Sequence, residues 1–324
     1  MFPVVYSDYA TSILSHLKQQ GIDVSELVAA SGLPSEYQQT ESTFLPLRAV
    51  FRLLEVTYQE LGDEKATALI RNALRTHIVP KTLSELGECK TVHQALNQVI
   101  RLIQVQIPQS KVSLDPMGDG VIFSRQKPVH TDDSAFIWSE VFTLWIMIEL
   151  VQALTKSNWL PKQVHVQSHS CSELIPCFPR QIQFIQAREA SGVIIDNKVL
   201  SQPVFISSPA PSDEDEGNAH YNAIGQTYSA LRPYVLELKF DLERAAQIIE
   251  VSKRTLQRRL NQHGITFRQL RDNLIADLAL EQLQKGEAVS RVAVNMGFAS
   301  ITQFSRSFKR ITGLAPSRIA LRQI

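Results

Sequence analysis

The stretch from Ala288 to Pro316 reads AVSRVAVNMGFASITQFSRSFKRITGLAP, and it decides the fold of the C-terminal part of the chain. Gly297 stands where a helix commonly ends in a left-handed residue. Ser300, with Gln303 three residues later, has the spacing of a capping box that begins a second helix. Before the glycine, apolar residues recur at i, i+3, i+4 and i+7, namely Val289, Val292, Ala293 and Met296. The stretch therefore predicts two helices joined by a tight turn, a helix-turn-helix.

The second of these helices is expected to have one apolar face and one basic face. At 100° per residue, Thr302, Arg306 and Lys309 point away from the apolar side chains. From residue 288 to residue 324 there are six Lys or Arg residues and no Asp or Glu. The buried face consists of Phe304, Phe308 and Ile311. This pattern predicts a surface that binds phosphates.

The same pattern occurs once more, 48 residues earlier. A second apolar stripe lies at Leu242, Ala245, Ala246 and Ile249. Thr266 and Gln269 form a capping box for a connecting helix that ends near Gly286. The shift places four residues on four others: Ser252 on Ser300, Leu256 on Phe304, Arg258 on Arg306 and Leu260 on Phe308. The C-terminal part is thus predicted to hold two helix-turn-helix units on one connecting helix.

The segment from Gly297 to Pro316, GF-x-S-x-x-x-F-S-R-x-F-K-R-x-x-G-x-x-P, closely resembles the signature of AraC/XylS-type bacterial transcription regulators. The resemblance implies a DNA-binding domain of two helix-turn-helix units and RNA polymerase as a partner. Two positions depart from the family. Glu250 stands in the first turn where the family commonly has Gly, so that turn is expected to be strained or differently shaped. Ile275 stands in the connecting helix where the family usually has Arg. The salt link that this Arg would make is then absent, so how rigidly the two helix-turn-helix units are coupled stays an open question.

Seven side chains are predicted to read base edges, at positions that face bases in the family. In the first unit they are Arg254, Gln257 and Arg258, and in the second Ile301, Thr302, Ser305 and Arg306. Arg grips guanine O6 and N7 with two hydrogen bonds, Gln does the same for adenine, and apolar groups suit the thymine methyl. Contacts to DNA phosphates, which fix the register without reading sequence, are predicted for Ser252, Arg259, Ser300, Lys309, Arg310 and Arg318.

The net charge of the 324 residues is only +1, but the two halves differ in sign. Residues 219–324 carry 16 basic and 8 acidic side chains, and residues 1–218 carry 17 and 24. The segment SSPAPSDEDEGN, residues 207–218, has the composition of a solvated linker. These observations predict an effector-binding or dimerisation domain at 1–206, a linker at 207–218 and a DNA-binding domain at 219–324.

The N-terminal half is predicted to be α+β. Helical patterns run through residues 7–105, a hairpin is expected from strands at 111–114 and 121–123, and a long apolar helix covers 134–155. The order of elements, the segment GIDVSELVAASGLP (Gly21–Pro34) and FLPL (Phe44–Leu47) resemble the arabinose-binding-like effector domain of this family. The resemblance implies an activator controlled by a small-molecule effector, whose binding residues the sequence does not name, and possible homodimers.

Several other functions are not favoured. Three Cys residues without a CxxC pair suit a reduced cytoplasmic protein. The resemblance to DNA-binding regulators implies that this protein is associated with the nucleoid. Glu140 and Glu149 inside the apolar helix argue against a membrane span. On a strand, His165 and His169 would be about 13 Å apart, too far to share a metal ion. No phosphate-binding glycine loop or nucleophile motif is present, so no cofactor, metal or enzymatic activity is expected.

Two alternatives stay open at this stage. The N-terminal half could dimerise without binding any effector. The aromatic residues Trp138, Phe142 and Trp145, at i, i+4 and i+7, could line the core or a dimer interface, or instead a ligand cage.

Overall fold

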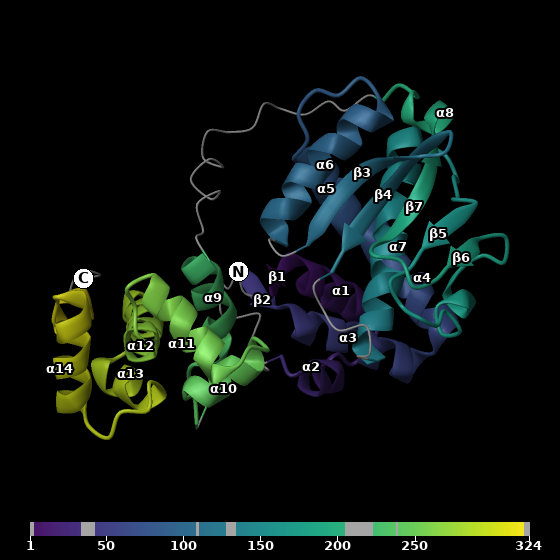
Figure 1. The fold of residues 1–324 in the computed structure, drawn as a ribbon. Helices are drawn as coiled ribbons and strands as arrows, with labels where there is room; N and C mark the ends of the chain where they lie inside the picture. Colours follow the sequence, from purple (N-terminus) through teal and green to yellow (C-terminus); the bar gives the residue numbers. More distant parts are fainter. Residues whose placement is uncertain are drawn as a thin grey trace. The chain divides into compact units, whose positions relative to one another are not determined.

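The computed structural model describes residues 3–33, 43–107, 110–127, 134–204, 223–237 and 239–320. The chain divides into two compact units, Met1–Asn222 and Ala223–Ile324 (Figure 1). The acidic segment 207–218, predicted to be a linker, lies outside the described residues. Each unit is treated separately below.

The N-terminal unit combines helices with a small sheet, as the sequence predicted. Its five-stranded sheet has the order β3-β4-β7-β5-β6, with β5 and β6 parallel and the other pairs antiparallel. A separate two-stranded sheet pairs β1 with β2. The strands are β1 (Val4–Tyr6), β2 (Phe44–Pro46), β3 (Lys111–Met117), β4 (Gly120–Gln126), β5 (Gln163–His165), β6 (Gln183–Ile185) and β7 (Ser191–Asp196).

Helices α6 and α7 pack against strands of this sheet, and the helices supply most of the buried apolar side chains of the unit (Figure 1). A π-helical turn, η1, continues α4 directly into α5, and a short 3-10 turn, η2, precedes β6. The elements are α1 (Asp8–Gln19), α2 (Ser25–Ser31), α3 (Leu47–Leu61), α4 (Asp63–Ala73), η1 (Leu74–Ile78), α5 (Val79–Ser84), α6 (Val92–Gln106), α7 (Ser134–Thr155), η2 (Ile175–Cys177) and α8 (Asn197–Leu200).

The hairpin is longer than the sequence indicated. Strands were expected at 111–114 and 121–123 with a six-residue loop, but β3 and β4 pair down to Met117 opposite Gly120. The turn therefore has only two residues, Gly118 and Asp119. Gly118 has a positive φ of 55° and Asp119 does not, which is the pattern of a type II′ turn. Pro116, a residue type typical of loops, lies on β3, whose outer side has no neighbouring strand in the sheet.

Helix α7 is apolar all round because it is surrounded by protein on nearly all sides. It is long and apolar enough to cross a membrane by length and composition, and 89% of its most apolar window is buried within the fold. Its aromatic residues pack as core: Trp138 stacks on Tyr58 at 4.3 Å, and Trp145 stacks on Phe178 at 4.9 Å between ring centroids. The structure therefore places these rings in the interior of the unit.

After β5 the chain bends between His165 and His169. The strand ends at His165, and residues 167–169 form a bend, so the extended spacing assumed for His165 and His169 does not apply. Within the described residues, no group of three or more His, Cys, Asp or Glu side chains is placed to hold a metal ion.

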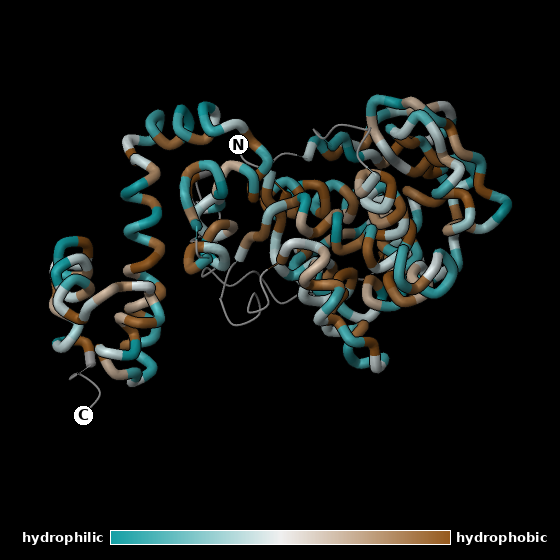
Figure 2. Tube along the Cα trace, turned by 90° about the horizontal axis from the view of Figure 1, so that it is seen from below, coloured by the Kyte–Doolittle hydropathy of each residue, from teal (hydrophilic) through white to brown (hydrophobic). Residues whose placement is uncertain are grey.

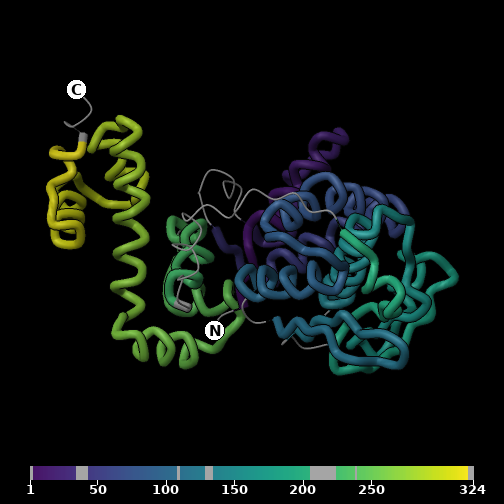
Figure 3. Tube along the Cα trace, turned by 90° about the horizontal axis from the view of Figure 1, so that it is seen from above, coloured from purple at the N-terminus to yellow at the C-terminus, as the bar shows by residue number. Residues whose placement is uncertain are grey.

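The C-terminal unit is helical, as predicted, and is built along one long helix. Figure 3 shows this helix, α12, as a continuous rod with α11 beside its start and α13 and α14 beside its later half. Polar and apolar residues alternate along α12 in Figure 2, because different faces of it are buried in turn. The elements are α9 (Ala223–Leu231), η5 (Arg232–Tyr234), α10 (Leu242–Ile248), α11 (Lys253–Gln262), α12 (Phe267–Gln284), α13 (Val289–Asn295), α14 (Ile301–Thr312) and α15 (Pro316–Ala320).

Candidate DNA-binding interface

The first helix-turn-helix consists of α10 and α11. Ser252 begins α11 by accepting a hydrogen bond from the backbone N–H of Thr255 at 3.1 Å. On α11, Leu256 and Leu260 are buried. They belong to a small core that also holds Ala245, Ala246 and Ile249. The stripe and the cap predicted for this unit are both confirmed.

The second helix-turn-helix consists of α13 and α14 and repeats these features. Ser300 begins α14 by accepting from the backbone N–H of Gln303 at 3.2 Å. Phe304 and Phe308 are the buried pair of α14, at 1% and 2% exposure, and their rings lie 5.5 Å apart. Val292, Ala293 and Met296 of the preceding segment are buried as predicted.

The two turns close with the same hydrogen bond. In the first, the N–H of Val251 donates to the carbonyl of Ala246 at 3.0 Å; in the second, the N–H of Phe298 donates to the carbonyl of Ala293 at 3.0 Å. This bond, which spans five residues, belongs to a helix that ends with a left-handed residue. Gly297 fills that position with φ 74°, whereas Glu250 fills it with φ 51°. The first turn therefore keeps the family geometry with a residue that adopts it at a cost.

The polar face predicted to read bases is exposed in both units. Arg254, Gln257 and Arg258 on α11 are exposed, and so are Ile301, Thr302 and Arg306 on α14, while Ser305 is half-buried. Ile301 is 49% exposed, so this large apolar side chain faces solvent instead of the core of the unit. Within the described part of the chain, Arg254, Arg258 and Arg306 form no ion pair. Their guanidinium groups are thus not committed to carboxylates of the C-terminal unit.

The residues predicted to contact phosphates have more varied surroundings. Ser252 and Ser300 cap their helices, Lys309 and Arg318 are exposed, and Arg259 is half-buried. Arg310 differs, because its Nη2 donates to Oδ2 of Asp272 at 2.8 Å. This ion pair ties α14 to the connecting helix α12.

Asp272 has a structural role that the sequence does not reveal. Nothing in the local pattern marks it, because its partner Arg310 lies 38 residues later. The carboxylate also lies within 4.0 Å of the guanidinium groups of Arg268 and Arg271, and its side chain is only 14% exposed. The Asp272 carboxylate therefore lies close to the guanidinium groups of three arginines, and this proximity is visible only in the folded unit.

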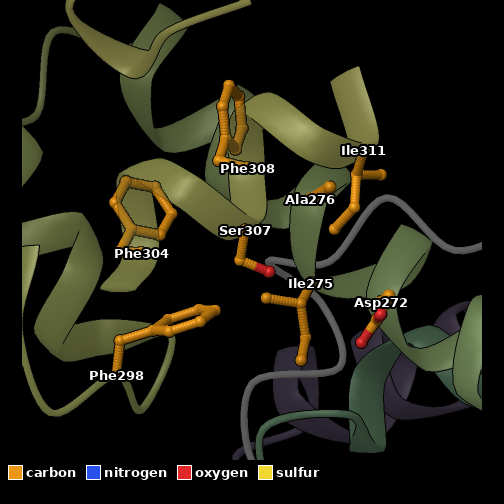
Figure 4. Close-up of a pocket in the computed structure, with 8 residues that line it drawn as sticks. All are labelled: Asp272, Ile275, Ala276, Phe298, Phe304, Ser307, Phe308 and Ile311. Atoms are coloured by element: carbon orange, nitrogen blue, oxygen red, sulfur yellow. The ribbon is translucent and has the colours of Figure 1, made fainter. Parts of the chain in front are cut away.

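Ile275 packs where an arginine was expected. Together with Phe298, Phe304 and Ile311 it lines a narrow, mostly apolar crevice between α12 and α14 (Figure 4). Figure 4 shows the Ile275 side chain directed towards Ser307 and the ring of Phe298. The second unit is thus held to α12 by apolar packing and by the Asp272–Arg310 pair, in place of the salt link that the family arginine would make.

The beginning of the unit is joined to α12 by polar contacts. Tyr228 on α9 donates its hydroxyl hydrogen to Asp277, and burial, followed by this hydrogen bond, raises the pKa of Tyr228. Arg232, itself buried, donates to Glu281 one turn further along α12. Asp277 and Glu281 are therefore used inside the unit.

Comparison with known protein families agrees with this geometry. The model of a helix-turn-helix domain matches residues 245–322, and the model of the arabinose-binding domain of AraC transcription regulators, N-terminal part, matches residues 21–204. The second match alone covers more than half of the chain. The chain belongs to the AraC-type helix-turn-helix transcription regulators.

Individual relatives share a shorter segment with this regulator. The ornithine utilization regulator of Pseudomonas aeruginosa is 36% identical over 78 residues, 24% of this chain and 23% of the relative. The regulator NimR of Escherichia coli is 37% identical over 78 residues, 24% of this chain and 29% of the relative. These matches span about a quarter of each relative's length.

A solved structure aligns with nearly the whole chain, although weakly. The transcriptional regulator CdpR of Pseudomonas aeruginosa covers 97% of this chain and 98% of its own, with 16% identity and a TM-score of 0.38.

Proposed function

We propose that this AraC-type regulator binds duplex DNA sequence-specifically by placing α11 and α14 in two successive major grooves. The observation that carries the proposal is the repetition: both helices have the same cap, the same closing turn, the same buried pair and an exposed polar face. The major groove admits one α-helix, and the same face of the duplex presents that groove again about 34 Å further along. Two such helices on one connecting helix would suit this spacing.

The proposed base readers divide by chemistry. Arg254 and Arg258 on α11, and Arg306 on α14, are suited to guanine, and Gln257 is suited to adenine. Ile301 and Thr302 offer apolar surface for a thymine methyl, and the Ser305 hydroxyl can donate or accept. All of these side chains except the half-buried Ser305 are exposed, and the three arginines form no ion pair within the described residues, which supports the assignment.

The proposed phosphate contacts surround this face. Lys309 and Arg318 offer exposed cations in the second unit, and Arg259 on α11 is half-buried in the first. Ser252 and Ser300 begin the two helices, where backbone N–H groups suit anions. Arg310 would have to share its guanidinium between a phosphate and Asp272. Its contribution to DNA affinity is therefore expected to be the smallest among the cations of this set.

The N-terminal unit is proposed to control this DNA binding. A small-molecule effector would bind to it, and the regulator would act as an activator that contacts RNA polymerase, as a homodimer, in the cytoplasm and without catalytic activity. The match to the arabinose-binding domain model supports an effector site, without identifying the sugar as the ligand. If the unit only dimerises, no small molecule will change its stability.

DNA binding is tested by salt titration on a selected site. The full chain is used to select duplexes from a random pool, and the affinity for the selected duplex is measured between 50 and about 200 mM salt. Neutralising about 6–10 phosphates predicts a log–log slope of roughly −5 to −9. A flat salt response would contradict the proposal.

Point variants separate the proposed roles on that duplex. Arg258→Ala is expected to cost about 1–3 kcal/mol and to relax base preference, whereas Lys309→Ala should weaken all sequences alike and reduce the slope by about 1. Lys285→Ala is the matched control, because Lys285 is an exposed cation just after α12, outside α11 and α14. If the control lost as much affinity as Arg258→Ala, the assignment of the base readers would be wrong.

A further inference from the structure

Two cations lie buried side by side in the N-terminal unit, far from any proposed DNA contact in the sequence. Arg125 is 7% exposed and Lys127 3% exposed, while Gln126 between them is exposed. Residues two apart on an extended chain lie on the same face, about 7 Å apart. Arg125 is on β4 and Lys127 follows it directly, so both side chains enter the interior at one end of this strand.

Helix α7 presents two hydroxyl side chains to these cations, one turn apart. Nη1 of Arg125 lies 3.4 Å from Oγ1 of Thr143, and Nζ of Lys127 donates to Oγ and to the backbone carbonyl of Ser139 at 2.8 and 2.5 Å. Because Ser139 and Thr143 are at i and i+4, they lie on one face of α7. The two cations are thus held at consecutive turns of the same helix.

Among the described residues, hydrogen-bond partners do not fully neutralise these cations. Nε of Arg125 donates to Ser110 at 2.9 Å, but Nη2 is buried and has no hydrogen-bond partner in the described part of the chain. The hydrogen bonds of the Lys127 ammonium go to uncharged oxygens of Ser139. Burial lowers the pKa of Arg125 to about 10, and burial together with the Arg125 charge lowers the pKa of Lys127 well below its usual range.

The nearby carboxylate of Glu140 is occupied elsewhere. Its Oε1 accepts from the N–H of Gln167 at 2.6 Å and from the hydroxyl of Ser191 at 2.5 Å, and its Oε2 accepts from Ser168. Glu140 acts on Lys127 only through its charge. Among the described residues, the charged forms of Arg125, Lys127 and Glu140 sum to one positive charge in the interior, and the lowered pKa of Lys127 reflects the cost of that charge. A bound anion would reduce this cost.

The surroundings of the cations are aromatic. The ammonium of Lys127 lies 5.4 Å from the ring centroids of both Phe51 and Phe136. Tyr9 lies edge-on to Phe142 at 6.0 Å, and the charge of Arg125 acts on its hydroxyl. An anion bound here would therefore contact apolar rings on the sides that do not face the two cations.

We propose that Arg125 and Lys127 bind the carboxylate of a small apolar monocarboxylic acid, between β4, α7 and α3. This inference rests on the proposed effector control and names the chemical class of the effector. One carboxylate offers an oxygen to the orphaned Nη2 and an oxygen to the ammonium, and its single charge balances the excess of the cluster. A doubly charged phosphate would leave a negative excess among the rings. In a site closed to water such charge-assisted hydrogen bonds are strong.

The test follows the unfolding of the N-terminal unit in the full chain. All three Trp residues of the protein, Trp138, Trp145 and Trp159, lie in this unit, so Trp fluorescence reports its unfolding alone. The probes are hexanoate, octanoate, benzoate and phenylacetate, each with its primary amide, and inorganic phosphate. At about 100 times Kd, a bound carboxylate is expected to raise the Tm by about 5 °C or more, and its amide should not.

Three variants locate the effect. Lys127→Met removes the charge and keeps the length in an apolar site, so the unit should fold, and the shift should disappear. Arg125→Lys keeps a charge but removes the fork that carries Nη2, and it should reduce the shift. Lys162→Met is the matched control, because the Lys162 side chain is 92% exposed in the same unit, and it should keep the full shift.

The opposite results overturn the inference. These are no shift with any of the four carboxylates, an equal shift with the amides, a shift with inorganic phosphate alone, or a shift that survives Lys127→Met. DNA binding is measured on the same preparations. If no carboxylate raises the Tm of the unsubstituted chain while this chain still binds DNA, only the ligand site is refuted. If a carboxylate raises the Tm but the chain does not bind DNA, the DNA-binding proposal is refuted.

Discussion

At the scale of single residues, Glu250 has a backbone conformation that favours glycine, and among the described residues it shares this positive φ with two other non-glycine residues, Lys156 and Ala187. Five helices of the C-terminal unit are followed by a residue with positive φ, and four of these residues are glycines: Gly264, Gly286, Gly297 and Gly313. Glu250 adopts the same conformation at φ 51°. A side chain in this region costs about 1–2 kcal/mol, because Cβ approaches the following carbonyl oxygen.

Glu250→Gly is therefore expected to stabilise the C-terminal unit. The relief of strain exceeds the entropy that glycine adds to the unfolded chain, so we expect a net gain of about 0.5–1 kcal/mol. The gain is measured by urea unfolding followed by far-UV circular dichroism, with the Trp transition of the N-terminal unit as an internal reference.

Gly297→Ala is the matched control for this prediction. A Cβ at Gly297 would meet no atom within 4 Å, so the substitution adds only backbone strain and should cost about 1 kcal/mol. If Glu250→Gly destabilised the unit while Gly297→Ala left it unchanged, strain at residue 250 would not be the reason for the turn's geometry.

At the scale of elements, helix α7 depends on a carboxylate that holds a loop and a strand to it. Glu140 is fully buried and accepts hydrogen bonds from Gln167, Ser168 and Ser191. Glu140→Ala leaves these donors without a partner and is expected to destabilise the N-terminal unit by about 2–5 kcal/mol.

This loss is read from the Trp-fluorescence transition in urea, which reports the N-terminal unit. Glu173→Ala is the control, because Glu173 is exposed and its substitution should change the free energy of unfolding by less than about 0.5 kcal/mol. A cost for Glu140→Ala as small as that of the control would mean that the buried hydrogen bonds contribute nothing net.

Elements whose signals are local could be predicted from the sequence. The bounds of α7 and the capping box of Thr266 agree with the prediction from the sequence, because stripes and caps involve residues three or four apart. Strands β1 and β2 were missed, because three residues are too few to show a period of two. The hairpin was drawn too short, because Pro116 and Gly118 resemble loop residues until the partner strand is known.

Contacts between distant residues could not be predicted. Ile275 stands where the family has an arginine, which predicts the loss of a salt link on the connecting helix. The structure joins α12 to α14 instead through the apolar side chains around Phe298 and through the Asp272–Arg310 pair, that is, between residues 20 to 40 positions apart. The buried cations Arg125 and Lys127 were likewise invisible, because their burial depends on α7, which follows them in the chain. The base-reading and phosphate residues were found from the repeat, and their roles stay predictions.

At the scale of the whole molecule, two features support DNA binding: the repeated helix-turn-helix and the difference in net charge between the two halves of the chain. Residues 219–324 have a net charge of +8, from 16 basic and 8 acidic side chains, and the two exposed helix faces lie in this part. Acidic residues of the unit such as Asp272, Asp277 and Glu281 are paired with Arg310, Tyr228 and Arg232 along α12. Among the described residues, Arg254 and Arg258 of α11 and Arg306 of α14 take part in no such pair, which leaves them available to DNA.

The most direct measurement compares two variants on single-base-pair substitutions across the selected duplex. Each of Arg258→Ala and Arg306→Ala should lose about 1–3 kcal/mol and lose base discrimination within one short segment, and the two segments should lie about one helical turn, roughly 10 base pairs, apart. Loss of discrimination at the same base pairs in both variants, or at none in either, would contradict the claim that one chain reads two successive major grooves.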